Sequence, residues 1–325
     1  MEKITWGILG CGDVTEVKSG PAFNKVRNSK IEAVMRRDAD KAKDYANRHH
    51  IDKWHNNADE LINDENINAI YIATPPAPHK DYAIQALKAG KHVYIEKPVT
   101  LTSAECETII EVEKASKNKV TVAHYRRAQP LFIKLKELID DKVIGDIRII
   151  DLKLFQKPDS EAIAKTDENW RINPEISGGG LFFDLAPHQL DILVHIFGEP
   201  LQYHGFSKNQ SKQNNVADIT VGQIAFKDDV IFNGVWCFNS QPDNEVEQCE
   251  FIGSKGKITL SFFNGLLSLT KNGKTVNFNY PPMQHVQQHL IEKTVNYFLG
   301  EEENPCSLQD ALISLKVMEV FGEIR

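Results

Sequence analysis

A lysine at the end of an apolar segment is well placed in this sequence to do chemistry. The segment His92–Ile95 has the composition of a buried β-strand, and Glu96, Lys97 and Pro98 follow it directly. Pro98 disfavours a helical conformation at Lys97, so the lysine is held extended at the carboxyl end of the strand. Open α/β sheets bind their ligands at this edge. Lys97 is therefore a candidate donor to a substrate oxygen, although a solvated lysine at a strand end would give the same sequence.

A carboxylate and an imidazole are spaced to act together further along the chain. A helix is expected from Asp184 to about residue 197, and His188 and Asp191 lie four and seven residues after Asp184, on the same helix face. A carboxylate one turn from an imidazole can fix its tautomer and raise its basicity, as a general base near neutral pH requires. A solvated polar face is the alternative interpretation. A metal site that includes His195 also fits the spacing, but the ligand pattern of zinc helices is absent and no metal is expected.

Glycine-rich segments precede both groups. The strand Ile4–Leu9 runs into a Gly-x-Gly turn in which Thr15 occupies the position of the usual third glycine. Thr15 either widens the contact between helix and strand or offers its hydroxyl to a phosphate, and Gly20-Pro21 is expected to break the helix that follows. The backbone predicted to approach a pyrophosphate is that of Gly10, Gly12, Asp13 and Val14. Three consecutive glycines at 178–180 would let the backbone pass close to a flat group such as a nicotinamide ring.

The end of the second expected strand bears on which dinucleotide is bound. The strand Ile31–Met35 is followed by Arg36 and Arg37, at the position where an enzyme specific for NAD usually has an acidic residue. Two guanidinium groups suit a 2′-phosphate, which they can hold by bidentate hydrogen bonds, and they can stack on adenine. A pair of exposed arginines, with Asp38 reaching the ribose, is the alternative. The sequence therefore favours NADP and leaves NAD open.

Strands and helices alternate through the first 123 residues and then give way to a different pattern. Alternation at this spacing predicts a doubly wound parallel sheet, so the fold class is α/β with a dinucleotide-binding domain at 1–123. After residue 124 the chain has many segments of alternating hydrophobicity, which predict an open, mainly antiparallel sheet with helices on one side. Residues 124–325 are therefore expected to form an α+β domain that binds substrate. Strands such as 230–238 carry apolar residues on both faces, which predicts a homodimer or homotetramer.

Composition limits the partners of the chain. Its 325 residues suggest two domains, and 38 basic against 45 acidic side chains give a net charge of −7 without a basic stripe. This argues against nucleic acid or an anionic membrane as a partner. Five scattered cysteines are typical of reduced thiols in a cytosolic protein. The first strand begins by Ile4, which is too early for a signal peptide, and no apolar run has membrane-spanning length.

Taken together and in this order, the motifs resemble one known family over essentially the whole chain. They are the Gly10–Asp13 turn, Ala73-Thr74-Pro75 with His79, Glu96-Lys97-Pro98, Trp170-Arg171, and Gly178–Gly180 through Asp184 to His188. The sequence is thereby similar to the glucose–fructose oxidoreductase / inositol dehydrogenase / rhizopine-catabolism (Gfo/Idh/MocA) family of NAD(P)-dependent oxidoreductases. The resemblance implies that Lys97, Asp184 and His188 are catalytic and that the peptide bond before Pro98 is cis.

The resemblance also extends the list of expected contacts. Further cofactor contacts would be Thr74, Pro75, His79, Glu96, Trp170 and Arg171, with Glu96 acting on the ribose or through its neighbours. Tyr125 and Arg127 would lie near the substrate, although the segment around them lacks the Asn and Phe that are common in the family.

The expected activity is hydride transfer to or from a sugar, polyol or related compound. His188 would move the hydroxyl proton, and Lys97 would hydrogen-bond the same oxygen. Two other classes share the resemblance: regulators that bind NAD(P) without catalysis, and hydrolases that use NAD as a transient oxidant of a glycoside.

Overall fold

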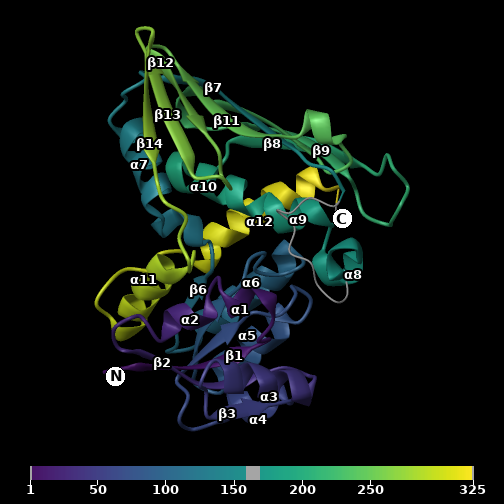
Figure 1. Ribbon diagram of the computed structural model, residues 1–325, viewed down its shortest axis with the longest axis vertical. Helices are drawn as coiled ribbons and strands as arrows, with labels where there is room; N and C mark the ends of the chain where they lie inside the picture. The colour runs from purple at the N-terminus through teal and green to yellow at the C-terminus, as the bar shows by residue number, and fades with distance from the viewer. Residues whose placement is uncertain (1, 159–168, 324–325) are drawn as a thin grey trace. The chain divides into compact units, whose positions relative to one another are not determined.

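The chain forms two compact units (Figure 1), and its computed structural model describes residues 2–158 and 169–323. The first unit comprises Met1–Ala128 and Met283–Leu312, and the second comprises Gln129–Pro282 and Ile313–Arg325. The sequence pattern predicts a single boundary between residues 123 and 124. The structure differs from that expectation because the segment 283–312 returns to the first unit.

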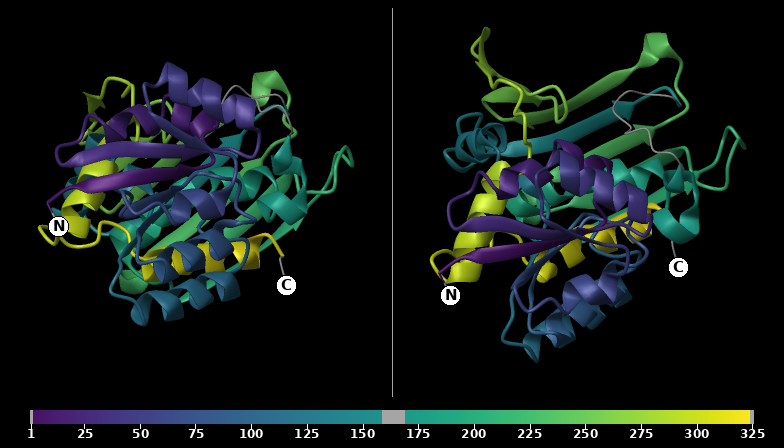
Figure 2. Two further views of the ribbon diagram at one scale, coloured as in Figure 1. Left: turned by 90° about the horizontal axis from the view of Figure 1, so that it is seen from below. Right: turned by 60° about the horizontal axis from the view of Figure 1, so that its bottom comes forward.

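The sheet of the first unit has six parallel strands in the order β3-β2-β1-β4-β5-β6. Its strands are β1 (Ile4–Leu9), β2 (Ser29–Met35), β3 (Lys53–His55), β4 (Ala69–Ile72), β5 (His92–Ile95) and β6 (Val120–Val122). Helices on both sides cover it (Figure 2): α1 (Asp13–Glu16), α2 (Gly20–Phe23), α3 (Ala39–Arg48), α4 (Ala58–Ile62), α5 (His79–Lys88) and α6 (Ser103–Lys114). Every residue of β4 and β5 is buried, as a parallel sheet between two helical layers requires. The predicted doubly wound sheet is confirmed.

The order of these strands marks where a ligand binds. The strand order reverses between β1 and β4, and doubly wound sheets bind dinucleotides outside the carboxyl ends of the strands at such a point. The first helix is short, since α1 ends at Glu16 and α2 starts at Gly20 with Pro21 in its first turn. The predicted break at Gly20-Pro21 is therefore confirmed.

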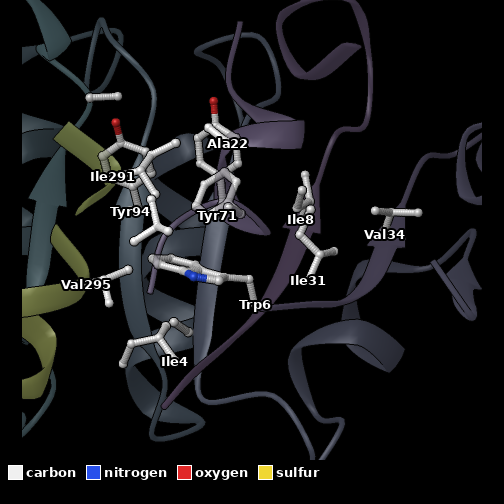
Figure 3. Packing of buried hydrophobic residues seen from close by; sticks show 14 of the residues in the cluster. Ile4, Trp6, Ile8, Ala22, Ile31, Val34, Tyr71, Tyr94, Ile291 and Val295 are labelled. Atoms are coloured by element: carbon white, nitrogen blue, oxygen red, sulfur yellow. The ribbon is translucent and has the colours of Figure 1, made fainter. Parts of the chain in front are cut away.

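Aromatic side chains and a returning helix form the core of the first unit (Figure 3). The ring centroids of Tyr71 and Tyr94 are 5.1 Å apart, and the Trp6 ring lies 6.3 Å from that of Tyr94. Helix α11 (Gln288–Leu299) adds Ile291 and Val295 to this cluster. The apolar face of α11 is buried against the first sheet, which is why segment 283–312 belongs to this unit. Helical periodicity predicts such a helix but does not say which sheet it covers.

The second unit is built on an eight-stranded sheet in the order β14-β13-β12-β11-β7-β10-β9-β8. Its strands are β7 (Ile147–Phe155), β8 (Gln202–Lys208), β9 (Ile219–Ala225), β10 (Ile231–Cys237), β11 (Val246–Gly253), β12 (Gly256–Leu260), β13 (Leu266–Lys271) and β14 (Lys274–Asn279). Among the described strands of this sheet, only β7 and β10 pair in parallel, and the other neighbours are antiparallel. The predicted open, mainly antiparallel sheet is confirmed, although β8 was not expected.

Helices line one face of this second sheet (Figure 1). They are α7 (Pro130–Asp140), α9 (Leu181–Leu185) and α10 (Pro187–Phe197), with the short α8 (Pro174–Ser177) preceding α9 and the end of α12 (Leu308–Phe321) joining them. Rings of the helices meet rings of the strands, as in the pair Phe182 and Trp236 with centroids 5.1 Å apart. The single helix expected from Asp184 to residue 197 is two helices, because Pro187 starts α10 and lacks the N–H that would continue α9. Over residues 2–158 and 169–323, every helix is too short or too polar to cross a bilayer.

Candidate functional site

The glycine-rich turn leaves open backbone next to the end of β4. Gly10 has a φ of +90°, and a Cβ there would lie 2.8 Å from Thr74 Cγ2, so only glycine fits this position. A Cβ built on Gly12 would meet nothing within 4 Å. The backbone at Gly12 is therefore open on that side, as the close approach of a pyrophosphate requires.

Thr15 is engaged inside the turn. Its Oγ1 donates to the Gly12 carbonyl oxygen at 2.7 Å, and its own carbonyl oxygen accepts from the Tyr45 hydroxyl at 2.8 Å. The hydroxyl is thus used by the turn rather than left for a phosphate. Gly20 supplies the close packing that the usual third glycine provides, because a Cβ on Gly20 would collide with the Thr15 carbonyl oxygen and the Tyr45 hydroxyl.

An ion pair anchors α1 to α3 behind the turn. Both carboxylate oxygens of Glu16 accept from Arg48, at 2.7 and 2.8 Å, and Glu16 also lies 2.9 Å from His49 Nε2. The hydrogen bond from Arg48 is the main reason that the pKa of Glu16 falls to about 2. Glu16 therefore remains charged at any pH near neutrality, and the four-residue α1 is held in place despite its length.

Of the two arginines predicted to contact the cofactor, Arg36 borders the glycine-rich turn. Its Nη1 donates to the Cys11 carbonyl oxygen at 3.4 Å, and its side chain is half-buried. Arg37 is exposed, and Asp38 caps α3 by accepting from the Lys41 N–H at 3.1 Å. The carboxylate that was the alternative ribose ligand is thus engaged at a helix N-terminus. Burial raises the pKa of the Cys11 thiol to about 12, so the thiol in the turn stays neutral.

Lys97 lies at the carboxyl end of β5 and is half-buried, and its peptide bond to Pro98 is cis, as the resemblance implied. The preceding residue, Glu96, is buried among hydrogen-bond donors. Its Oε1 accepts from the Tyr71 hydroxyl and from Gln287 Nε2, both at 2.6 Å, and its Oε2 accepts from the Lys97 N–H at 3.2 Å. Three donors converge on this carboxylate, so Glu96 holds the end of the strand and is not placed to act as a base.

His79 joins the ends of β4 and β5. Its Nε2 lies 2.8 Å from the Thr74 carbonyl oxygen, and its Nδ1 lies 3.1 Å from that of Pro98 and 3.2 Å from that of Val99. The side chain is fully buried, and burial lowers its pKa. His79 therefore positions the two strand ends and does not itself offer a surface to a cofactor, which revises the direct contact expected from the sequence.

The residues around the turn fit a dinucleotide. Besides the open backbone at Gly12, the hydroxyl Oγ1 of Thr74 is buried and finds no hydrogen-bond partner among the described residues. Pro75 follows it, half-buried, at the same sheet edge. The Gly10–Val14 turn, Arg36, Thr74, Pro75, Glu96 and Lys97 thus all lie at the carboxyl ends of the first sheet's strands.

In the second unit, Asp184 pairs with Arg171. Arg171 Nε donates to Asp184 Oδ2 at 2.6 Å, and both side chains are largely buried, with exposures of 9% and 14%. The guanidinium also lies over the Trp170 ring, 4.5 Å from its centroid. The sequence suggested His188 as the partner of Asp184 and did not anticipate this ion pair. The structure thus gives this carboxylate a guanidinium partner from the 3₁₀ turn that precedes α8.

His188 lies in the first turn of α10 and is 6% exposed, with its ring centroid 6.0 Å from that of Phe263. Asp191 is also buried, so the predicted helix face is an interior face and the solvated alternative does not hold. Of the three glycines at 178–180, Gly180 packs against the Val216 side chain, because a Cβ on it would lie 2.7 Å from Val216 Cγ2. Glycine at this position therefore allows close packing on Val216, and the approach of a nicotinamide to the 178–180 backbone stays a prediction.

Tyr125 and Arg127 lie in the 3₁₀ turn Tyr125–Ala128 of the first unit. The Arg127 side chain is only 6% exposed, and its Nη1 is 3.4 Å from Asp310 Oδ2. This ion pair links Arg127 to the returning segment, and a contact of Arg127 with the substrate stays a prediction. Tyr125 is half-buried and packs beside the core of the same unit.

Comparison with known proteins places both units in one family. Residues 4–124 match the "Oxidoreductase family, NAD-binding Rossmann fold" and residues 132–259 match the "GFO/IDH/MocA C-terminal domain". The chain is 47% identical to "Oxidoreductase P35" of Formosa agariphila, over 98% of each chain. It is 30% identical to a "D-xylose 1-dehydrogenase (NADP(+))" of Hypocrea jecorina, over 58% of this chain and 51% of the relative. The crystal structure of an aldose-aldose oxidoreductase from Caulobacter crescentus has the same fold, with a TM-score of 0.86 at 22% identity over 98% and 96% of the two chains.

Proposed function

The chain belongs to the GFO/IDH/MocA family of NAD(P)-dependent oxidoreductases, and from this membership we propose that it acts on a sugar, polyol or related hydroxy or carbonyl compound. The observation that carries the proposal is the position of Lys97. A half-buried ammonium group stands at the carboxyl end of β5, in the same sheet whose glycine-rich turn leaves open backbone for a pyrophosphate. The relative named for D-xylose oxidation supports a sugar-like substrate.

The proposed chemistry divides the work among three side chains. Nicotinamide, when bound, supplies or accepts the hydride. His188 accepts the hydroxyl proton during oxidation and returns it during reduction. Asp184 accepts from Arg171 Nε, and its proposed role is to orient the imidazole and to favour the protonated form by its negative charge. Lys97 donates a hydrogen bond to the same substrate oxygen and stabilises the negative charge that develops on it.

A panel of sugars, inositols and small ketones tests the proposal. The protein is incubated with each compound and either dinucleotide, and the absorbance of the reduced nicotinamide is followed. We expect net formation or consumption of reduced cofactor with at least one polyhydroxylated substrate. Deuterium should pass from labelled reduced cofactor to product in the reduction direction, and from the labelled substrate carbon to the cofactor in the oxidation direction. Hydrolysis of a glycoside without net cofactor reduction would instead identify a hydrolase. Dinucleotide binding without any deuterium transfer would identify a regulator.

We expect NADP(H) to bind at least about tenfold more tightly than NAD(H), which corresponds to roughly 1.4 kcal/mol. The reason is that Arg36 lies beside the glycine-rich turn and can pair with a 2′-phosphate, while Asp38 is engaged in capping α3. Replacing Arg36 by Asp should narrow or reverse the preference, as measured by fluorescence titration with both dinucleotides. Arg27→Asp, an exposed site on the same unit, makes the same charge change as a control. Equal or tighter binding of NAD(H) by the unmodified protein would contradict the prediction.

The open face of the second sheet suggests how the protein assembles. Ile149 pairs in register with Ile231 on one side and with Ile252 on the other, and the three side chains are 37%, 42% and 36% exposed. Phe206, on β8 of the same sheet, is 52% exposed. The described helices of this unit pack on the opposite face (Figure 1). We propose that a second copy of the chain covers these apolar residues, since one patch used twice closes a symmetric dimer.

Light scattering at micromolar concentration measures this assembly. We expect the mass of a dimer or tetramer. We expect Ile231→Lys to shift the protein towards monomer, because it places a charge in the patch that the second copy would bury. Ile133→Lys makes the same change at a site on α7 that is 41% exposed, and it should leave the mass unaltered. A monomeric mass for the unmodified protein would refute the proposal.

A further inference from the structure

Residues 285–287, near the start of the returning segment 283–312, contact two regions of the first unit that border the expected cofactor site. They precede α11 and come from the far end of the chain, yet their side chains reach the strand end at Glu96 and the backbone that follows α1. We propose that Gln287 and His285 are positioning residues: Gln287 fixes Lys97 through Glu96, and His285 fixes the glycine-rich turn through Val17. This inference rests on the proposed function only in giving Lys97 a catalytic role.

Two hydrogen bonds, one to Tyr94 and one to Glu96, hold the Gln287 amide in one orientation. Its Oε1 accepts from the Tyr94 hydroxyl at 3.0 Å, which directs its Nε2 towards Glu96 Oε1, 2.6 Å away. Gln287 is 1% exposed, so no solvent competes for these bonds. Burial raises the pKa of both Tyr71 and Tyr94, and Tyr94 therefore remains a donor. Only one orientation of the amide lets its oxygen accept from Tyr94 while its nitrogen donates to Glu96, and in that orientation it stabilises the Glu96 carboxylate.

Glu96 passes this support to Lys97 through the backbone. The oxygen opposite Gln287, Oε2, accepts from the Lys97 N–H at 3.2 Å. A buried carboxylate that loses one of its donors rotates to recover hydrogen bonds, because an unsatisfied charge in the interior is costly. Rotation of Glu96 would break the bond to the Lys97 N–H and loosen the strand end that carries the ammonium group. Small displacements of a group that acts on a substrate have large effects on rate.

His285 makes the second connection. Its Nδ1 lies 2.6 Å from the Val17 carbonyl oxygen, and its Nε2 lies 2.6 Å from Lys25 Nζ. Because a carbonyl only accepts, Nδ1 carries the proton, and Nε2 accepts from the lysine. The Gln287 N–H also donates to the Lys18 carbonyl oxygen at 3.2 Å. The segment thus attaches to the chain directly after α1, the helix that opens at the glycine-rich turn.

Substitution of Gln287 is expected to lower kcat, and substitution of His285 is expected to weaken dinucleotide binding. This difference distinguishes positioning roles from a general contribution to stability, which would affect both quantities in both variants. Gln287→Met keeps the length of the side chain and removes its amide, and it should lower kcat by about 10- to 100-fold with unchanged dinucleotide affinity. His285→Leu should weaken dinucleotide binding by about three- to tenfold, seen in fluorescence titration of the protein without substrate. Gln284→Met makes the first change on an exposed side chain of the same segment and serves as the control, with both quantities unaltered.

Hydrogen exchange of the protein without ligands gives a readout that does not require turnover. In Gln287→Met, the peptide that contains Lys97 should exchange faster than in the control, while peptides from β2 remain unchanged. If the unmodified protein transfers no hydride, the proposed function fails, but exchange and dinucleotide affinity still decide this inference. Unchanged exchange and unchanged kcat in Gln287→Met would overturn it. If that variant does not fold, Tyr94→Phe removes only the bond that orients the amide, and the same peptide must then exchange faster for the inference to stand.

Discussion

Replacing His188 by Ala is expected to lower turnover by roughly 10²- to 10⁴-fold, the usual contribution of a positioned general acid or base. The imidazole is the proposed carrier of the hydroxyl proton, and Ala leaves no titratable group at that place in α10. Affinity for the dinucleotide should be unchanged, because the glycine-rich turn and Arg36 belong to the first unit and keep their contacts. Steady-state kinetics on the best substrate of the panel and fluorescence titration with the dinucleotide measure the two quantities.

His195→Ala is the matched control, since it makes the same change two turns later on the same helix and on a half-buried side chain. It should retain most of the activity. If His188→Ala kept full activity, or His195→Ala lost as much, the assignment of the proton carrier would be wrong. Loss in both variants, together with stimulation of the unmodified protein but of neither variant by added divalent metal, would instead favour the metal alternative.

Asp184→Asn, a companion variant to His188→Ala, is expected to have a milder effect that appears mainly in the pH dependence. The change removes a negative charge and leaves the Arg171 guanidinium, only 9% exposed, without its carboxylate partner. Both consequences disfavour a protonated imidazole nearby, so the acid limb of the pH–rate profile should move to lower pH. An unshifted profile with a uniformly lower rate would show that Asp184 supports the fold at Arg171 and does not act on His188.

Replacing Lys97 by Met is expected to lower turnover by roughly 10²- to 10³-fold, as loss of one donor to a developing negative charge does in other enzymes. Methionine keeps the volume of the lysine stem but removes the ammonium group. Dinucleotide binding should also weaken, because the side chain stands at the sheet edge that the glycine-rich turn shares. Stopped-flow measurement of hydride transfer separates the chemical step from binding and product release.

The control for Lys97→Met is Lys88→Met, which removes an exposed ammonium group near the end of α5 in the same unit. It should leave hydride transfer unaltered. Undiminished hydride transfer in Lys97→Met would show that the lysine is the solvated strand-end residue that the sequence also allows. Structures of both variants should keep the Glu96 contacts to Tyr71 and Gln287, because neither of these depends on the Lys97 side chain.

The local features of the cofactor edge followed from the sequence because short-range constraints decide them. A strand that runs into Gly10 and Gly12 must turn, since only glycine adopts the φ of +90° found at Gly10. Lys97 was placed at a strand end because an apolar run precedes it and Pro98 stops any helix there. The same reasoning identified the break at Gly20-Pro21. Each of these rests on the backbone preferences of a few adjacent residues, which do not depend on the rest of the chain.

Only the tertiary structure decided which polar groups pair. Gln287 meets Glu96 across 191 residues of sequence, and nothing in either segment marks the other as its partner. Asp184 pairs with Arg171, a partner that the sequence did not suggest, because the 3₁₀ turn at Trp170 brings a guanidinium to the carboxylate.

The assignment of α11 to the first unit has the same origin. Its apolar periodicity predicts a buried face, and any apolar surface would satisfy that face, since the hydrophobic effect is not directional. Local geometry in the sequence therefore determined most of the elements, the glycine-rich turn and the strand end at Lys97, but not β8 or the division of the helix at Pro187. Burial and hydrogen bonding between distant segments determined the partners of those residues, because a carboxylate or an apolar helix face accepts many partners and only the folded chain selects one.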